Sequence, residues 1–531
     1  MVFQPYSVSP PSPITRCGAR PIAGALTALA LVLAPALSAQ TVVNSRVSDS
    51  VPAPISPVDS EFSHRDSAAN WGFTPSVVTS TANAEHVAIS RTCGEDVPPR
   101  RVTQALNEDQ FESQPRFWWA LGEVTLANAM DWLHHRILIQ ADWTKVSPSS
   151  WVHNVTNGLQ WDYDPLEINN VTHPYSGGQY YNAARANGYG VWGSAAFAMG
   201  GSVMWEYLGE TQSPSPNDLL NTLLGGTVYG EVAWRISVAM LDDKATGMNR
   251  FLREFGSLLI NPGLGVHRII HGDAWHTSPS LPTISHGPIR LDLALGTTKA
   301  TPETPTLDQR LNSIQPALTF LVNYGDPFQS GSQRPLSVFS VRTEMTGPVL
   351  TRLAVVGQLA RPSLSGTDED RSSLGVDLES DYLVNPAYRF ATANLTLRHS
   401  ATRGSVRGWR LGSNVGLIGV VLGAASNGST RPGWDYDYGP GMGVRLGGLL
   451  EYSGNQLLSV GYDGYWVHSL MGPTSNNWLQ NVGAQIRTPR LAGLYAAADY
   501  QKYWRLSEYP SIPSERRQSQ KLTLFLGLTG R

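Results

Sequence analysis

The amino-acid sequence predicts an α+β protein, in which a small helical module with a polar core precedes a C-terminal antiparallel, up-and-down transmembrane β-barrel. Three observations lead to this prediction. Only 15% of the 531 residues are charged, and the chain contains 51 glycines and 16 tryptophans, whereas roughly 25% of an ordinary soluble domain is charged. An uncharged stretch with small residues at helical spacing lies in the first half, and runs of alternating apolar and polar residues fill the second half.

The charge balance excludes one class of partner. Lysine and arginine total 39 and aspartate and glutamate total 42, which gives a formal net charge of -3. A nearly neutral chain has no basic field with which to hold a phosphate backbone, and we therefore expect no nucleic-acid partner. Cys17 lies in a segment that we expect to be removed, so Cys93 would be the single thiol of the mature chain, without an internal disulfide.

The N-terminal segment has the three parts of an export signal. Arg16 and Arg20 precede the apolar run 21–36, and the small residues of 37–39 offer a cleavage site. This pattern predicts a signal peptide over residues 1–39. A retained membrane anchor is the competing interpretation, but the run is short for a membrane span and no lipobox cysteine follows it. Export would separate the protein from the cytosolic supply of nucleotide cofactors, and for this reason we expect no cofactor.

Residues 40–113 are rich in Ser, Thr, Val and Pro without a sustained period, which predicts a flexible leader. Residues 114–300 are expected to form the helical module. Apolar residues at mixed three- and four-residue spacing predict a helix over 117–138, and weak alternation predicts short strands within 143–172.

Two stripes of small residues predict a tight pair of helices within this module. No residue of 186–205 is charged, and small residues recur at every fourth position in two segments: Ser194, Ala198 and Ser202, then Thr222, Gly226 and Gly230. Such stripes allow helices to approach closely and are common in membrane bundles, although soluble cores also contain them. We expect this helical hairpin to contact lipid or to lie enclosed by the barrel.

Residues 301–531 are expected to form the barrel. From about Gln315 the apolar residues follow a period of two, in runs of roughly ten residues separated by turn residues, which is typical of membrane barrels. In the last run, apolar residues occupy one face throughout: Leu522, Leu524, Leu526 and Leu528. A soluble β-sandwich alternates in the same way and is the competing interpretation.

A dense set of polar and aromatic residues lies between residues 161 and 235. In chain order it contains WDYD (161–164), HPYSG (173–177), AR ending at Arg185, WEYLGE (205–210), PSPNDL (214–219), GG (225–226), GE (230–231) and Arg235. This ordered set resembles a bacterial envelope family, the domain of unknown function 3943, over about residues 117–272. The resemblance implies an outer-membrane setting and supplies no established reaction.

Several of these polar groups are expected to converge. Glu206 and Glu210 lie four residues apart on one predicted helix, and Asp218 and Asn221 share a face of the next. In a medium of low dielectric constant such groups must be hydrogen-bonded, paired or protonated. Two arginines are their expected partners: Arg185 and Arg235.

Candidate site residues follow from this convergence. The candidates for catalysis are His173, Glu206, Glu210 and Asp218, and those for ligand binding are Tyr175, Arg185, Asn221, Glu231 and Arg235. In the functional interpretation a carboxylate acts as general base, His173 acts as acid or ligand, and Arg185 holds an anionic head group. The alternative is a buried polar clasp that sets the register of the hairpin.

Two other patterns do not predict sites. The segment 188–193 matches GxGxxG, but no β-rich strand precedes it, so we expect no dinucleotide there. Four closely spaced groups resemble metal ligands: His267, His271, Asp273 and His276. However, the Asn-Pro-Gly sequence at 261–263 favours a surface loop, and no glutamate lies between the histidines. We therefore expect no metal site.

Together, these features predict an exported protein of the bacterial outer membrane, with the periplasm as the alternative location. The expected role is structural or lipid- or ligand-binding, and the expected partners are outer-membrane lipid, the barrel-assembly machinery and a small amphipathic ligand. The alternative is a membrane-embedded lipid hydrolase or acyltransferase that uses the His/Glu/Asp cluster, and of the two we favour the non-enzymatic role. A passive channel is a third class, which requires an open lumen.

Overall fold

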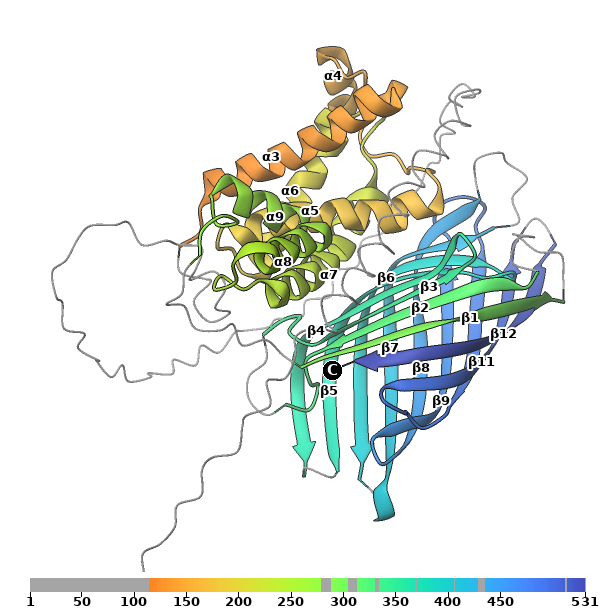
Figure 1. Cartoon of the computed structure of the whole chain (residues 1–531). Coiled ribbons are helices and arrows are strands. Elements are labelled where there is room, and N and C mark those ends of the chain that lie inside the picture. Colours follow the sequence, from red (N-terminus) through yellow and green to blue (C-terminus); the bar gives the residue numbers. More distant parts are fainter. Residues whose placement is uncertain are drawn as a thin grey trace, which may run out of the picture.

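The computed structural model describes residues 114–277, 288–303, 313–329, 334–367, 370–404, 406–427, 435–510 and 513–530. Within these residues a group of helices precedes a β-barrel in the chain, and the two parts lie against each other (Figure 1). The predicted signal peptide (1–39) and leader (40–113) lie outside the described residues.

The helical module contains α-helices and short π-helical and 3-10 segments. Its elements are α3 (Phe117–Leu133), η2 (His134–Ile139), η3 (Asp142–Thr144), α4 (Pro148–Thr156), η4 (Ile168–Thr172), α5 (His173–Ala186), α6 (Val191–Met204), η5 (Trp205–Gly209), α7 (Pro216–Met240), α8 (Gly247–Ile260) and α9 (Pro262–Ile270). The helix expected over 117–138 is present as α3 and η2. Among the described residues, no helix combines the length and the hydropathy that a membrane crossing requires.

Two local expectations for this module are wrong. The short strands expected within 143–172 are absent from this described segment, and residues 148–156 form α4 instead, because Ser147 and Ser150 form a capping box and Pro148 occupies the first turn of the helix. The surface loop expected at 261–263 is the start of α9. The Asn261 side chain accepts a hydrogen bond from Leu264 N, and proline is readily accommodated where helical N–H groups lack partners.

The stripes of small residues pack as predicted, but their common partner is α5. A Cβ atom on Gly226 would lie 2.7 Å from Gly177 Cα, and one on Gly177 would lie 2.2 Å from Thr222 O. One turn along α5, Tyr181 contacts both Gly230 of α7 and Ala198 of α6. Helices α6 and α7 also contact each other directly, so the predicted pair forms a three-helix unit with α5. The missing side chains allow the α5 and α7 backbones to touch.

The barrel is closed and consists of neighbouring antiparallel strands, in the order β1-β12-β11-β10-β9-β8-β7-β6-β5-β4-β3-β2. The strands are β1 (Ile289–Pro302), β2 (Gln315–Tyr324), β3 (Phe339–Thr346), β4 (Val349–Gly366), β5 (Arg371–Val384), β6 (Arg389–Arg403), β7 (Trp409–Ser426), β8 (Tyr436–Tyr452), β9 (Asn455–His468), β10 (Asn476–Arg487), β11 (Leu494–Glu508) and β12 (Glu515–Gly530). The predicted up-and-down barrel is confirmed. The boundary expected between residues 300 and 301 falls inside β1.

Ion pairs between strands that are not neighbours identify the face that lines the lumen. Arg445 of β8 contacts Glu379 of β5 at 2.9 Å, and Lys521 of β12 contacts Glu344 of β3 at 3.1 Å. Such pairs can form only across the inside of a closed barrel. An apolar layer also faces inward, and it includes Tyr388, Phe390, Ile418, Val467, Leu479 and Tyr503. Charged and apolar layers thus both occupy the lumen.

The residues that alternate with the lumen-facing residues of each strand point outward, and they form an apolar surface. Leu522, Leu524, Leu526 and Leu528 of β12 are 49–72% exposed and alternate with inward residues such as Lys521. Cross-strand partners share a face, so the register extends this apolar surface to β1 through Leu526 and Leu295. An outward apolar belt around a polar interior is the arrangement of a lipid-embedded barrel.

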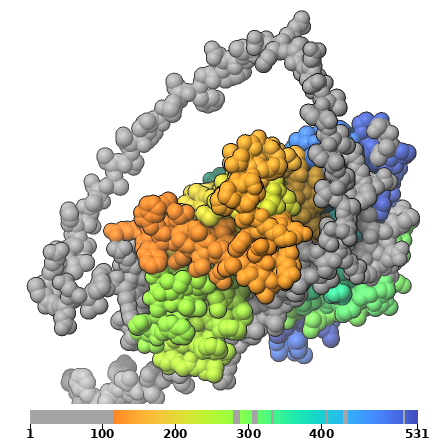
Figure 2. Space-filling model, turned by 90° about the horizontal axis from the view of Figure 1, so that it is seen from above, coloured from red at the N-terminus to blue at the C-terminus, as the bar shows by residue number. Residues whose placement is uncertain are grey.

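The helical module packs on the outer wall of the barrel. In β5, Ser380 and Tyr382 alternate with the inward Glu379 and therefore face outward. Both contact the module, since Tyr229 of α7 lies 3.5 Å from Ser380 and Tyr382 is almost fully buried. Helix α7 runs over β4 to β7, and Figure 2 shows the helices spread across one side of the molecule. The hairpin was expected either to contact lipid or to lie enclosed by the barrel, and the second of these alternatives is therefore wrong.

Candidate functional site

The predicted site residues separate into two polar groups. The acid cluster consists of Asp162, His173, Glu206, Glu210 and Asp218, and the arginine clasp consists of Tyr181, Arg185, Glu231 and Arg235. Asn221 lies beside the acid cluster, where its amide donates to Asn169 O at 2.8 Å. Tyr175 lies on the α3 side of α5, where burial and the negative charge of Asp131 raise its pKa to about 12.

The acid cluster forms where α7 begins. Ser215 caps this helix, with its hydroxyl oxygen accepting from Asp218 N at 3.1 Å. Glu206, in the π-helical segment η5, accepts a hydrogen bond from Ser215 N at 2.8 Å. The Glu206 carboxyl and the Asp218 carboxyl are thus brought to the same helix N-terminus, where backbone N–H groups favour acceptors.

The cluster departs from the predicted geometry at Glu210. Glu206 and Glu210 do not share a helix face, because the helical segment ends at Gly209 and Glu210 is extended, with φ -137° and ψ 165°. Glu210 is instead held through its backbone, since its carbonyl accepts from the Asn154 side chain at 2.9 Å. His173 does reach Asp218, with 3.7 Å between His173 Nε2 and Asp218 Oδ1.

Burial and mutual repulsion favour the protonated carboxyl groups. Burial, followed by the negative charge of Asp218, raises the pKa of Glu206 to about 8. Burial also raises the pKa values of Glu210 and Asp218 well above the usual range. Glu206 is fully buried, and its Oε1 atom makes no hydrogen bond within the described residues. The cluster can therefore hold protons at neutral pH and release them to a base.

The acid cluster borders the barrel wall. The hydroxyl of Tyr436, at the start of β8, accepts from the Asn169 amide at 2.9 Å and donates to the Asp164 carbonyl. Trp161 stacks on Tyr438, with 5.5 Å between ring centroids. Neither tyrosine is among the residues predicted from the sequence. They lie more than 200 residues from the cluster, and the only available signal was a pair of aromatic residues on one face of a strand.

Glu231 is the centre of the arginine clasp, and other members of the clasp occupy both of its carboxylate oxygens. Glu231 Oε2 accepts from Arg185 Nε at 2.9 Å and from Tyr181 at 2.7 Å, while Glu231 Oε1 contacts Arg235 Nη2 at 2.8 Å. Burial alone would raise the pKa of Glu231, but the charges of Arg185 and Arg235 outweigh it and lower that pKa. The expectation that these arginines pair with the acid cluster is wrong. Their geometry is that of a clasp between α5 and α7.

Comparisons with known proteins confirm the resemblance found in the sequence. Residues 158–263 match the family model of a domain of unknown function, DUF3943. This segment contains the acid cluster and the arginine clasp and is shorter than the range of about 117–272 inferred from the sequence. No curated protein matches the chain.

Similar solved structures include outer-membrane barrels. The NanC porin is 8% identical, with a TM-score of 0.25, over 44% of this chain and 98% of that chain. The KdgM porin is 8% identical, with a TM-score of 0.20, over 45% and 99%. A loop-deletion variant of OmpT, an outer membrane protein of Vibrio cholerae, is 7% identical, with a TM-score of 0.19, over 46% and 100%. The closed barrel and its apolar outer belt place the present chain in the bacterial outer membrane.

Proposed function

We propose that this outer-membrane protein is a lipid-binding protein, in which the barrel anchors the helical module so that exposed apolar helix faces contact lipid. The observation that carries the proposal is the position of α7 on the outward face of β4 to β7. The outward face of a membrane barrel borders hydrocarbon. A module fixed to that face therefore has lipid as its neighbour at its flanks.

The amphipathic helix α8 supports this proposal. Its buried face carries Arg250 and Ser257, whereas Phe251, Leu252 and Phe255 are 45–57% exposed. Helix α3 and the segment after it expose a second apolar group, which includes Trp118, Met130, Leu133, Ile137 and Leu138. Exposed apolar groups of this kind mark protein or membrane contacts, and the apolar outer belt of the same chain favours lipid.

The charges around α8 and α9 are distributed in the same sense. Arg268 is fully buried and forms ion pairs with Asp243 at 2.7 Å and with Glu254 at 2.8 Å. Beside this buried ion pair, Phe251 and Phe255 stack on the surface, with 5.8 Å between ring centroids. Charges inside and aromatic rings outside are typical of helices that face lipid.

Spin-label accessibility in vesicles tests the proposal. A nitroxide would be attached to Phe255→Cys, or to Asn157→Cys as an exposed polar control, in the full chain carrying Cys17→Ser and Cys93→Ser. At position 255 we expect collisions with oxygen to exceed those with a water-soluble nickel chelate, and at position 157 the reverse. If the nickel chelate reached both positions equally, the proposed contact between position 255 and lipid would be wrong.

An enzymatic role is the second candidate, favoured by one observation. His173 lies beside Asp218, within a cluster in which one buried carboxyl oxygen of Glu206 makes no hydrogen bond to any described residue. A histidine next to protonated acids is suited to proton transfer in lipid hydrolysis or acyl transfer. Loss of a modified lipid in cells carrying Glu210→Gln, with barrel assembly intact, would support this role. Unchanged lipid composition would exclude it for this residue.

A further inference from the structure

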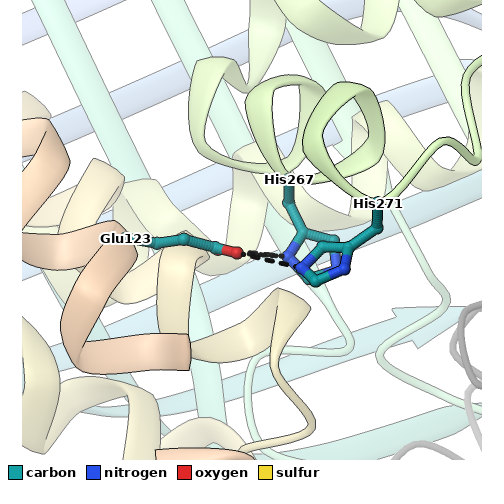
Figure 3. Close-up of side chains that lie close together, drawn as sticks. All are labelled: Glu123, His267 and His271. Atoms are coloured by element: carbon teal, nitrogen blue, oxygen red, sulfur yellow. Dashed lines mark hydrogen bonds and ion pairs between the residues drawn. The ribbon is translucent and has the colours of Figure 1, made fainter. Parts of the chain in front are cut away.

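A third polar group lies apart from the acid cluster and the arginine clasp. His267 of α9 and His271, the C-cap residue of that helix, lie one turn apart, and α3 presents Glu123 to both of them (Figure 3). Glu123 Oε1 lies 2.8 Å from His267 Nδ1 and 3.5 Å from His271 Nε2. The ligand atoms of all three side chains lie within 4.8 Å of one another. Two imidazoles and one carboxylate are therefore aimed at one point.

The surroundings of this group hold it in place. Glu123 and His267 are buried, and the Asn187 amide donates to Glu123 Oε2 at 2.9 Å, which orients the carboxylate. Trp119 packs against the His271 ring, with 4.8 Å between ring centroids. Partners that orient ligands in this way are typical of metal sites.

One nitrogen of the group is buried and only weakly satisfied. His271 Nε2 is inaccessible to solvent, makes no hydrogen bond of good geometry within the described residues, and contacts Glu123 Oε1 at 3.5 Å. A buried polar atom that lacks a good hydrogen bond is costly, and coordination of a cation would satisfy it. This observation is independent of the spacing of the two histidines.

We propose that Glu123, His267 and His271 bind a divalent transition-metal ion of the zinc class. The ion would be held by one Glu123 oxygen, by His267 Nδ1 and by His271 Nε2. Two histidines and one glutamate form a known donor set for zinc, and three protein ligands leave a fourth position for water. The proton now shared between His267 Nδ1 and Glu123 would leave Nδ1 on binding, because the metal requires the nitrogen lone pair, and the neutral ring would carry its proton on Nε2 instead.

Arg116 opposes binding in the metal-free protein. Its Nη2 atom lies 3.3 Å from His267 Nε2, where a guanidinium can only donate. If Nδ1 binds a metal, Nε2 must carry the proton and becomes a donor as well. Arg116 would then have to turn away, so its removal should strengthen metal binding. A purely structural Glu123–His267 pair gives no reason for this effect.

Cobalt titration of the full chain in detergent tests the proposal. Co²⁺ bound by nitrogen and oxygen ligands gives visible absorption that zinc then abolishes by displacement. His271→Ala should weaken Co²⁺ binding by at least about tenfold, and Arg116→Ala should strengthen it. The matched control is His134→Ala, which removes a ligand from the other grouping of potential ligands in the described chain, Asp131, His134 and His135.

The outcomes divide clearly. Binding that is weakened by His271→Ala and unaffected by His134→Ala supports the site. The proposal is overturned if the wild type binds no Co²⁺, or if His134→Ala abolishes binding while His271→Ala leaves it unchanged. Weakened binding in Arg116→Ala would also overturn it. Helical circular dichroism of each variant shows whether the module is folded.

Discussion

The hydroxyl of Tyr382 donates a hydrogen bond to Glu167 over 2.8 Å and joins two residues that are 215 positions apart. Tyr382 belongs to strand β5 and faces away from the lumen, whereas Glu167 belongs to the helical module. This bond therefore shows which surface of the barrel the module covers. An aromatic side chain that would otherwise face lipid is fully buried under helices and has a polar partner for its hydroxyl.

We expect Tyr436→Phe to weaken the packing of the helical module on the barrel wall. The substitution leaves the fully buried Asn169 amide without its acceptor, and an unsatisfied buried donor costs about 1 to 3 kcal/mol. Thermal unfolding followed by helical circular dichroism should show a lower midpoint. The control is Tyr452→Phe at the other, exposed end of the same strand. Equal midpoints for the two variants would contradict the assigned contact.

Gly226→Ala should disrupt the packing of α5 against α7. The new Cβ would lie 2.7 Å from the Gly177 backbone, and two backbones that already touch cannot separate without loss of packing. Overpacking of this kind costs typically 1 to 3 kcal/mol. Gly200→Ala is the control, because no atom lies within 4 Å of its Cβ and alanine favours a helix by about 0.5 to 1 kcal/mol. Denaturant unfolding should give opposite signs for the two variants.

The stability of the module should fall as pH rises from about 5 to 8. The pKa of Glu206 is about 8 in the folded chain, against 4.5 as its ordinary value. Between these values the folded state binds a proton that the unfolded state has lost, so rising pH favours unfolding. Midpoints measured across this range should decrease in the wild type and decrease less in Glu206→Gln. A midpoint that rises with pH would exclude a protonated Glu206.

Glu231→Ala should be strongly destabilising. It leaves the buried guanidinium groups of Arg185 and Arg235 without their shared carboxylate, and breaking a buried pair typically costs 3 to 5 kcal/mol. Lys145→Ala removes an exposed ion pair with Asp142 and should change the free energy of unfolding by less than about 1 kcal/mol. Unboiled samples should keep the electrophoretic mobility of a closed barrel in both variants, because neither residue belongs to a strand. If boiled and unboiled samples of Glu231→Ala had the same electrophoretic mobility, the clasp would be needed for barrel assembly.

The sequence by itself determined the barrel and its outward face. In β12 the alternation of leucines with other residues is a local property, since successive side chains of a strand point to opposite faces. The ordered polar set around Glu206 and Glu231 was likewise visible, because buried polar groups stand out in a chain with few charges. The helix ends were less predictable. Pro262 begins α9 because Asn261 caps it, and a cap depends on side-chain geometry that spacing alone does not contain.

Only the tertiary structure decided where the module lies and which polar groups meet. The outward direction of Tyr382 follows from the Glu379–Arg445 ion pair across the lumen, and its partner Glu167 lies in the module. Glu123 and His267 are 144 positions apart and become neighbours only when α3 packs beside α9. Periodicity reports which face of an element is apolar. It carries no information about which other element covers that face, because this depends on long-range packing of the whole chain.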